Sequence, residues 1–143
     1  MPHCWMDGSY GGTPDGAVRA GRDRDGDPIF VGRAWHEGDL LPAKVVPNKG
    51  GAYVCWGGTE HHKDQYEVMC DASAAWVDTQ GGDVPEGAVP IGQTSDGERL
   101  YMGRVMHDGA LTPGKVHPSH GVCYIPYGGQ ELSFPQYEIL VLK

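Results

Sequence analysis

The chain repeats itself, and this repeat constrains the fold more than any other feature of the sequence. Aligned with itself at an offset of 71 residues, the chain needs no gap, and 27 of the 66 positions from Trp5 to Cys70 find an identical partner. Chance similarity does not give this match, so one ancestral unit has been duplicated. We expect two modules, residues 1–73 and 74–143, that are tightly docked about a pseudo-twofold axis.

Each unit is rich in residues that interrupt helices. Gly occurs 23 times and Pro 11 times in 143 residues, and neither is favoured inside a helix. Short alternating segments between turns predict strands over 17–21, 28–35, 43–46, 52–56, 66–70, 88–92, 99–106, 115–117, 122–127 and 137–142. Asp25-Gly26 and Asp96-Gly97 are typical of tight hairpin turns. The predicted fold class is all-β, with two small antiparallel β modules.

The charge balance argues against two classes of partner. The net charge is −8, and each unit contributes −4. An acidic chain without a basic face is poorly suited to nucleic acid or to an anionic membrane. No apolar run approaches the length of a membrane span, so membrane insertion is not expected. No secretory signal is visible at the N-terminus, which favours a cytoplasmic location, with release by a non-classical route as the path to the outside.

Cysteines and histidines give no clear cofactor or metal signal. The four cysteines form no CxxC pair, so free buried thiols are the default expectation. His61 and His62 have Leu132 and Ser133 as their matches, and neighbours on a strand point to opposite faces. The acidic run 23–27 lacks the distal Glu of a calcium loop. We therefore predict no metal and no cofactor.

The charged residues that both units share are the candidate functional groups. The matched pairs are Asp25/Asp96, Arg33/Arg104, His36/His107, Lys44/Lys115, Glu60/Glu131 and Glu67/Glu138. For Arg33 and Glu67 a structural ion pair is favoured, and for Asp25 the hairpin turn itself. Lys44 and Lys115 follow a proline at the same place in both units, which leaves a ligand role and a structural role equally open.

The matched motifs resemble a known family. The first unit reads Gly-Arg-Ala-Trp-His-Glu-Gly, Leu-Pro-Ala-Lys-Val and Ala-Tyr-Val-Cys-Trp-Gly-Gly-Thr-Glu, and the second reads Gly-Arg-Val-Met-His-Asp-Gly, Leu-Thr-Pro-Gly-Lys-Val and Cys-Tyr-Ile-Pro-Tyr-Gly-Gly-Gln-Glu. These runs resemble the DM-nine repeat, which is also found in natterin-like proteins. Length and tandem arrangement are similar to those of two-repeat, mannose-specific lectins of bivalve molluscs.

The resemblance implies a function. It implies a lectin for mannose and high-mannose N-glycans, with a homodimeric assembly and a part in innate immune recognition. Because the acidic run 23–27 is not a calcium loop, we expect the sugar site to be calcium-independent. The resemblance also implies that an Asp of the first hairpin and the Lys of the Pro-x-Lys-Val motif bind sugar; here these are Asp23 and Lys44. The second unit keeps the lysine but has Thr94 in place of Asp23. The full set of candidate carbohydrate-binding residues is Asp23, Lys44, Lys115, Asp96, Glu37, His36 and His107.

Two other functions remain open at this point. A glycosidase needs two carboxylates across a cleft, which Glu60 with Glu131, or Glu37 with Asp108, would supply. No nucleophile or phosphate-loop motif is visible, so the prediction is a binding protein rather than an enzyme. A protein-interaction module using the same loops is the second alternative. The tryptophans are candidate sugar platforms, but each is expected in the core: Trp5, Trp35, Trp56 and Trp76.

Overall fold

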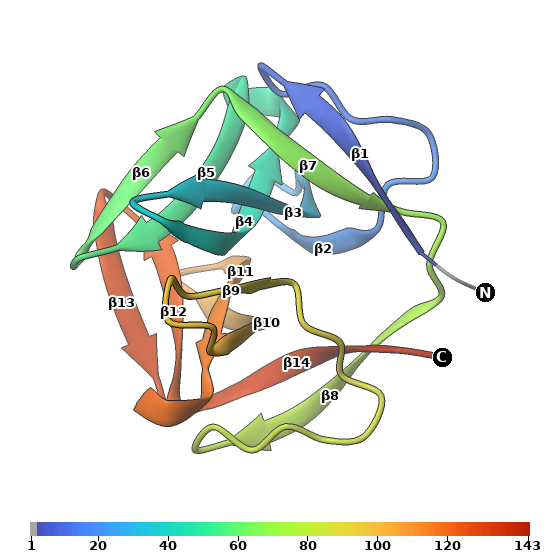
Figure 1. Cartoon of the computed structure of the whole chain (residues 1–143). Coiled ribbons are helices and arrows are strands. Elements are labelled where there is room, and N and C mark those ends of the chain that lie inside the picture. Colours follow the sequence, from blue (N-terminus) through green and yellow to red (C-terminus); the bar gives the residue numbers. More distant parts are fainter. Residues whose placement is uncertain (1–2) are drawn as a thin grey trace.

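The computed structural model describes residues 3–143 and is almost entirely β-structure, which confirms the predicted fold class. Figure 1 shows two halves, one from the first repeat and one from the second, with both chain ends on the same side. The first half contains β1 (Cys4–Ser9), β2 (Arg19–Arg22), β3 (Pro28–His36), β4 (Asp39–Val46), β5 (Gly51–Trp56), β6 (Thr59–Lys63) and β7 (Gln65–Cys70). The second contains β8 (Ala74–Gln80), β9 (Gly92–Gln93), β10 (Arg99–His107), β11 (Ala110–His117), β12 (Val122–Tyr127), β13 (Gln130–Phe134) and β14 (Gln136–Leu142).

Two short 3-10 helices interrupt this pattern at matched places. They are η1 (Pro47–Lys49), before β5, and η2 (Pro118–His120), before β12. Each ends on a glycine with positive φ, a conformation that glycine adopts without strain. In the described part of the chain, no helix is long and apolar enough to cross a membrane.

Both halves use the same strand pairing. In the first half β3 pairs with β4 and β7, β7 also pairs with β1, and β4 continues through β5 to β6. In the second half β10 pairs with β11 and β14, β14 pairs with β8, and β11 continues through β12 to β13. All of these pairs are antiparallel, which allows the consecutive strands among them to be joined by short turns.

The halves are joined by strand pairing as well as by side chains. Strand β2 pairs with β11, β4 with β9, and β6 with β13, so every one of these contacts links one repeat to the other. Gly21 and Gly92 stand at two of the crossings. A Cβ atom at Gly21 would collide with the carbonyl oxygen of Leu111, and one at Gly92 with that of Leu40. Glycine is therefore needed where the two backbones meet.

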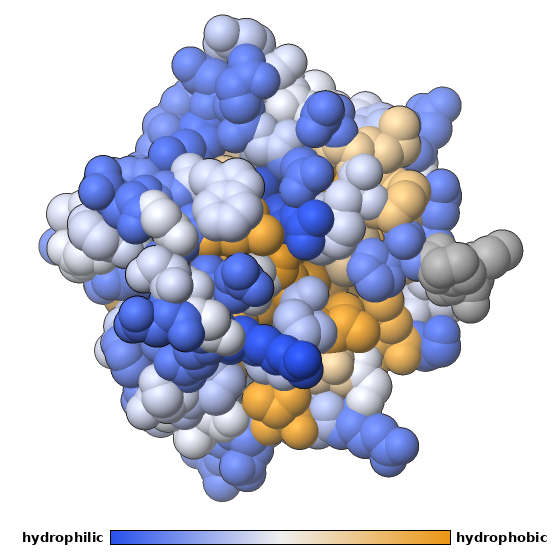
Figure 2. Space-filling model, in the orientation of Figure 1, coloured by the Kyte–Doolittle hydropathy of each residue, from blue (hydrophilic) through white to orange (hydrophobic). Residues whose placement is uncertain are grey.

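A shared core lies between the halves. One apolar cluster combines residues of both repeats, among them Val31 and Met69 of the first and Met102 and Leu140 of the second. Figure 2 shows apolar residues at the centre of one face, between the two halves, surrounded by hydrophilic residues. Two further clusters each serve mainly one half. The division of the chain at residues 73 and 74 stays a prediction, but the halves pack against one another through apolar contacts.

Ion pairs at matched positions of the two repeats stabilise the contact between the halves. Arg33 Nε donates to Glu67 Oε1 at 2.8 Å, and Arg104 Nε donates to Glu138 Oε1 at 2.7 Å. Each arginine also donates to a carbonyl oxygen of the other repeat, Arg33 to Ile91 and Arg104 to Ala20. Their guanidinium groups lie 3.9 and 4.2 Å from the ring centres of Trp5 and Trp76, respectively.

Several predicted strand limits are wrong. The expected strand over 88–92 survives only at Gly92, where β9 begins; Pro90 stands at the position of Arg19, which pairs with Phe30 in the first half. Strands β1, β6, β8 and β13 were not predicted. Trp35 is also a correction: it was expected in the core, but 62% of its surface is exposed.

Candidate functional site

Two hollows related by the internal repeat lie where the halves meet. The first, of about 350 Å³, is lined by Asp23, Arg24, Asp25, Lys44, Lys49, Tyr53, Glu60, Tyr127 and Gly128. The second, of about 410 Å³, is lined by Glu37, Asp39, Trp56, Thr94, Ser95, Asp96, Glu98, His117 and His120. We call them the first and the second pocket. Both volumes fall within the range of small-molecule sites.

The first pocket is built around a buried lysine. Lys44 lies on β4 and is only 4% exposed, with its Nζ 3.6 Å from Glu60 Oε2. Its Nζ also lies 5.7 and 5.6 Å from the ring centres of Tyr53 and Tyr127. Burial lowers the pKa of Lys44, and the nearby carboxylates of Glu60 and Asp23 oppose this shift. An ammonium group in this position gains from any ligand that supplies oxygen acceptors.

Asp23 reaches the same pocket from the turn between β2 and β3. The backbone N–H of Asp23 donates to the backbone carbonyl oxygen of Asp27, and the N–H of Gly26 donates to the carbonyl oxygen of Asp23. Gly26 has a φ of 86°, which the predicted Asp-Gly turn requires. The turn thus places Asp23 at the pocket that holds Lys44.

The second repeat closes the first pocket. The N–H of Gly129 donates to Glu60 Oε1 at 3.0 Å, which ties the β12–β13 turn to β6. The hydroxyl of Tyr127 donates to Asp108 Oδ2 at 3.1 Å, and Asp108 lies 3.7 Å from Arg24. Burial and this hydrogen bond both raise the pKa of Tyr127. The aromatic wall of the first pocket therefore comes from the other repeat.

The second pocket uses the same plan but handles its lysine differently. Lys115 Nζ lies 2.9 Å from Glu131 Oε2 and donates to the Cys55 carbonyl oxygen at 2.9 Å. Its side chain is 8% exposed and is not part of the pocket lining. Glu131 in turn accepts from the Gly58 N–H at 2.9 Å, the reciprocal of the Gly129–Glu60 bond. Lys115 thus has two close contacts with protein oxygens, whereas Lys44 has one longer contact.

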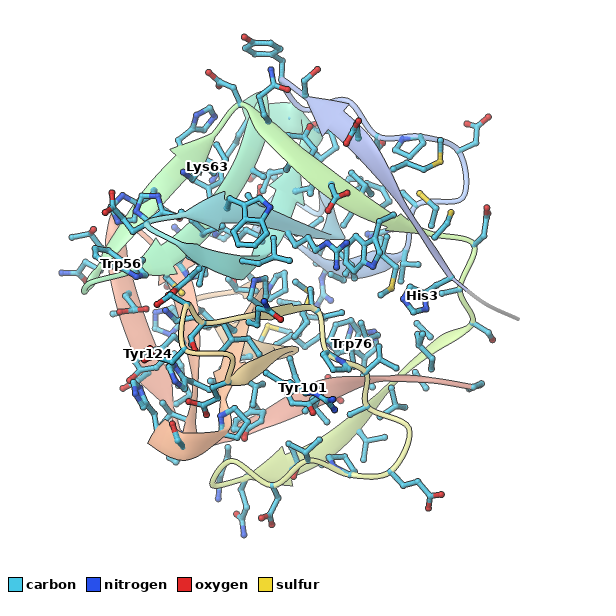
Figure 3. The ribbon with its side chains drawn as sticks, in the orientation of Figure 1. His3, Trp56, Lys63, Trp76, Tyr101 and Tyr124 are labelled. Carbon is cyan, nitrogen blue, oxygen red and sulfur yellow. The ribbon has the colours of Figure 1, made fainter. Side chains whose placement is uncertain are left out.

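Two histidines line the second pocket. The rings of His117 and His120 stack with their centres 3.6 Å apart and their planes at 9°. His117 Nε2 lies 3.0 Å from Glu98 Oε1, and His120 Nδ1 lies 2.8 Å from the hydroxyl of Tyr124. Burial and the neighbouring His120 lower the pKa of His117, although Glu98 opposes this. Figure 3 shows Trp56 and Tyr124 at the edge where the two halves meet.

The predicted site residues divide among three places. Asp23 and Lys44 line the first pocket, and Asp96 and Glu37 line the second, while Lys115 lies beneath the second. His36 and His107 line neither pocket. They pack behind the aromatic walls: His36 against Trp56, with ring centres 5.4 Å apart, and His107 against Tyr127 at 5.0 Å.

Sequence reasoning missed several pocket residues. Tyr127, Lys49 and His120 were not singled out, although Tyr127 is the match of Trp56 and His120 is the match of Lys49. The two residues of each pair differ, whereas most of the candidate residues were taken from pairs that are identical in the two repeats. The origin of the aromatic wall of the first pocket could not be predicted either, because the alignment does not show that the β12–β13 turn of the second repeat covers the first repeat.

All four cysteines are free, and three of them are buried. His61 packs against His36 on one side of β6, and His62 packs against Tyr53 on the other. Among residues 3–143, no three His, Cys, Asp or Glu side chains come together in a way that could hold a metal ion.

Two larger surface grooves are lined by the arginines and glutamates of the structural ion pairs, and not by a buried lysine such as Lys44. One, of about 820 Å³, includes Arg104 and Glu138, and the other, of about 660 Å³, includes Arg33 and Glu67. In each groove the arginine already donates to the glutamate and to a carbonyl oxygen. The first pocket is therefore the stronger candidate site, because Lys44 retains donor capacity.

A family model for the DM9 repeat matches residues 23–134, which include both pockets' central residues. The chain belongs to the DM9 repeat family. It is also similar to natterin-4 and natterin-3 of Thalassophryne nattereri, with 27% identity over 134 residues and 25% over 137. These matches cover 91% and 93% of this chain but only 32% and 34% of the natterins, so this DM9 chain spans about a third of their length.

The fold has a solved counterpart. The chain superposes on the nematode sperm cell motility protein MFP2B with a TM-score of 0.71 at 15% identity. The match covers 99% of this chain and 47% of that chain. At this identity the likeness shows a shared β fold and carries nothing about function.

Proposed function

We propose that this DM9 protein is a calcium-independent lectin whose first pocket binds mannose, alone and at the ends of high-mannose N-glycans. The observation that carries the proposal is Lys44: a buried ammonium, 3.6 Å from Glu60, at an open pocket that also contains the Asp23 carboxylate. A hexose presents neighbouring hydroxyls that both donate and accept hydrogen bonds. Lys44 donates to their oxygens and Asp23 accepts from their protons.

The aromatic wall supports the same ligand class. Tyr53 and Tyr127 face the ammonium of Lys44 from the two repeats, and apolar ring faces pack against the C–H groups of a sugar. His107 and Asp108 hold Tyr127 in place. A ring fixed in this way loses little conformational freedom when a ligand binds.

One of the two carboxylate pairs considered for hydrolysis, Glu60 with Glu131, is engaged with the protein. Glu60 and Glu131 each accept from a glycine N–H of the opposite repeat and each pair with a lysine of their own repeat. These contacts favour a role in positioning the lysines over one in acid–base chemistry. We therefore propose a binding protein rather than an enzyme.

Weak binding of a single sugar is strengthened by repetition. A small polar ligand gains little over its hydration, so each pocket alone binds weakly. A homodimer would present the site twice and raise the avidity for branched glycans. We propose this homodimeric state as part of an extracellular role in innate recognition; sedimentation velocity, with and without mannan, tests the assembly.

Calorimetric titration of the protein with mannose, and with glucose for comparison, tests the proposed function. We expect heat of binding for mannose, unchanged by EDTA, and its loss in Asp23→Asn, which keeps the size of the side chain but removes its charge. Lys63→Ala, outside the first pocket, is the matched control and should bind as the wild type does. Failure of the folded wild-type protein to bind mannose or any mannose-terminated glycan would overturn the proposal.

A further inference from the structure

The two pockets differ in charge far more than in shape. The first pocket has three acidic side chains and three basic ones in its lining: Asp23, Asp25, Glu60, Arg24, Lys44 and Lys49. The second has four acidic side chains, Glu37, Asp39, Asp96 and Glu98, and within the described residues no lysine or arginine lines it. The basic residues were lost at matched positions, where Arg24 corresponds to Ser95 and Lys49 to His120.

Two of these carboxylates are committed to the protein and two are not. Glu98 accepts from the N–H and the hydroxyl of Ser119, and Asp39 accepts from the Ser95 N–H at 2.8 Å. Across the described residues, the structure shows no hydrogen bond or ion pair to the side chain of Glu37 or Asp96. Both are exposed at the pocket, one from each repeat.

Trp56 gives this pocket an aromatic wall. Its ring is held from behind by His36, with centres 5.4 Å apart, and by His61 at 6.5 Å. An indole is the strongest aromatic partner for an organic cation, and free carboxylates beside it add charge-assisted hydrogen bonds. The hydroxyl-bearing residues Thr94 and Ser95 complete a lining suited to a polyhydroxylated cation.

We infer that the second pocket binds an amino sugar with a free, protonated amine, such as a glucosamine unit. The inference rests on the proposed function, since the second pocket repeats the plan of the proposed sugar pocket. Glu37 and Asp96 bind the ammonium group, and Trp56 packs against the same face of the sugar. Lys115 does not repel this ligand, because it is buried and neutralised by Glu131. One chain then carries two sugar sites with different ligands.

Binding of glucosamine and N-acetylglucosamine trisaccharides, measured by calorimetry at neutral pH and low salt, tests the inference. Acetylation replaces the charged amine by a larger, neutral amide, so we expect the free amine to bind at least about tenfold tighter, and the carboxylate variants show how much of this preference is due to charge. Glu37→Gln and Asp96→Asn should each remove most of this preference. Asp108→Asn and Asp25→Asn are matched controls, because they make the same charge change at the positions that the internal repeat pairs with Glu37 and Asp96.

The outcomes separate this inference from the proposed function. Lys44→Met should abolish mannose binding and leave glucosamine binding unchanged. Equal affinity for the two trisaccharides, or a loss of glucosamine binding as large in Asp25→Asn as in Asp96→Asn, would overturn the inference as mere attraction to an acidic protein. If the protein does not bind mannose but prefers glucosamine in a way that depends on Glu37, the proposed mannose site is wrong and the inference for the second pocket is supported.

Discussion

The first and second pockets share one backbone plan, yet their lysines have different tasks. Lys44 has one carboxylate contact at 3.6 Å and lines an open pocket, whereas Lys115 has two contacts at 2.9 Å and lies beneath its pocket. An identical residue at an identical position is thus available to a ligand in one repeat and occupied in the other. Conservation within a duplication preserves the scaffold, and the neighbours decide what each copy can bind.

The largest expected effect concerns stability. Lys115→Met leaves the buried Glu131 without its cation, so we expect a loss of about 3 kcal/mol in the free energy of unfolding. Lys44→Met should cost about 1 kcal/mol, because the ammonium of Lys44 is buried with poorer compensation. Urea denaturation of both variants measures the difference, and equal losses would show that the two lysines are equivalent.

A second experiment changes one pocket toward the other. The double substitution Ser95→Arg and His120→Lys places at the second pocket the basic residues that stand at the first. We expect the preference for the free-amine trisaccharide to fall to about the level of the acetylated one, because the added cations repel the ammonium. Calorimetry with both trisaccharides measures this, and a preference that survives the substitutions would contradict the role given to charge.

A smaller effect is expected from pH. Burial lowers the pKa of His117 below its ordinary value of 6.5, so the unfolded chain takes up this proton first as the pH falls. The stability that neutral His117 contributes is therefore fully present above pH 6.5. It is lost as the pH falls below 6.5 toward the lower pKa of His117 in the folded protein. Although burial opposes it, hydrogen bonds from Ser119 and the nearby His117 lower the pKa of Glu98, which adds a loss at more acidic pH.

The first repeat supplies the control for this pH effect. The match of His117 is Val46, which does not titrate. His117→Val should therefore flatten the decline in urea midpoint between neutral and mildly acidic pH. An unchanged slope would show that the stacked pair of His117 and His120 does not contribute to it.

Sequence reasoning predicted most of the scaffold for identifiable reasons. The duplication, the Asp-Gly turns and the apolar alternation of β3, β5, β7, β10, β12 and β14 are local signals, and these elements are present. The β6 segment Thr59–Lys63 was missed because its residues are almost all polar, and its pairing with β13 is set by the other repeat. The Arg33–Glu67 pair was predicted because both residues and both matches persist.

The site was harder to predict because it is assembled between the repeats. Lys44 was a candidate from the internal repeat and from the family resemblance, and Asp23 from the resemblance alone; the structure brings both to one pocket. Tyr127 could not be placed there, since the alignment gives no distance between the β12–β13 turn and β4. For the same reason His36 and His107, which are conserved between the repeats, were taken for ligand-binding residues, although they pack behind the aromatic walls.

Calorimetric titration of mannose into wild-type, Lys44→Met and Lys44→Arg proteins tests the central claim most directly, with thermal unfolding confirming that each variant is folded. We predict one mannose bound per chain in the wild type, a loss of affinity greater than about tenfold in Lys44→Met, and partial retention in Lys44→Arg, because charged hydrogen bonds contribute this much. Undiminished affinity in folded Lys44→Met would contradict the claim that this buried ammonium binds the sugar.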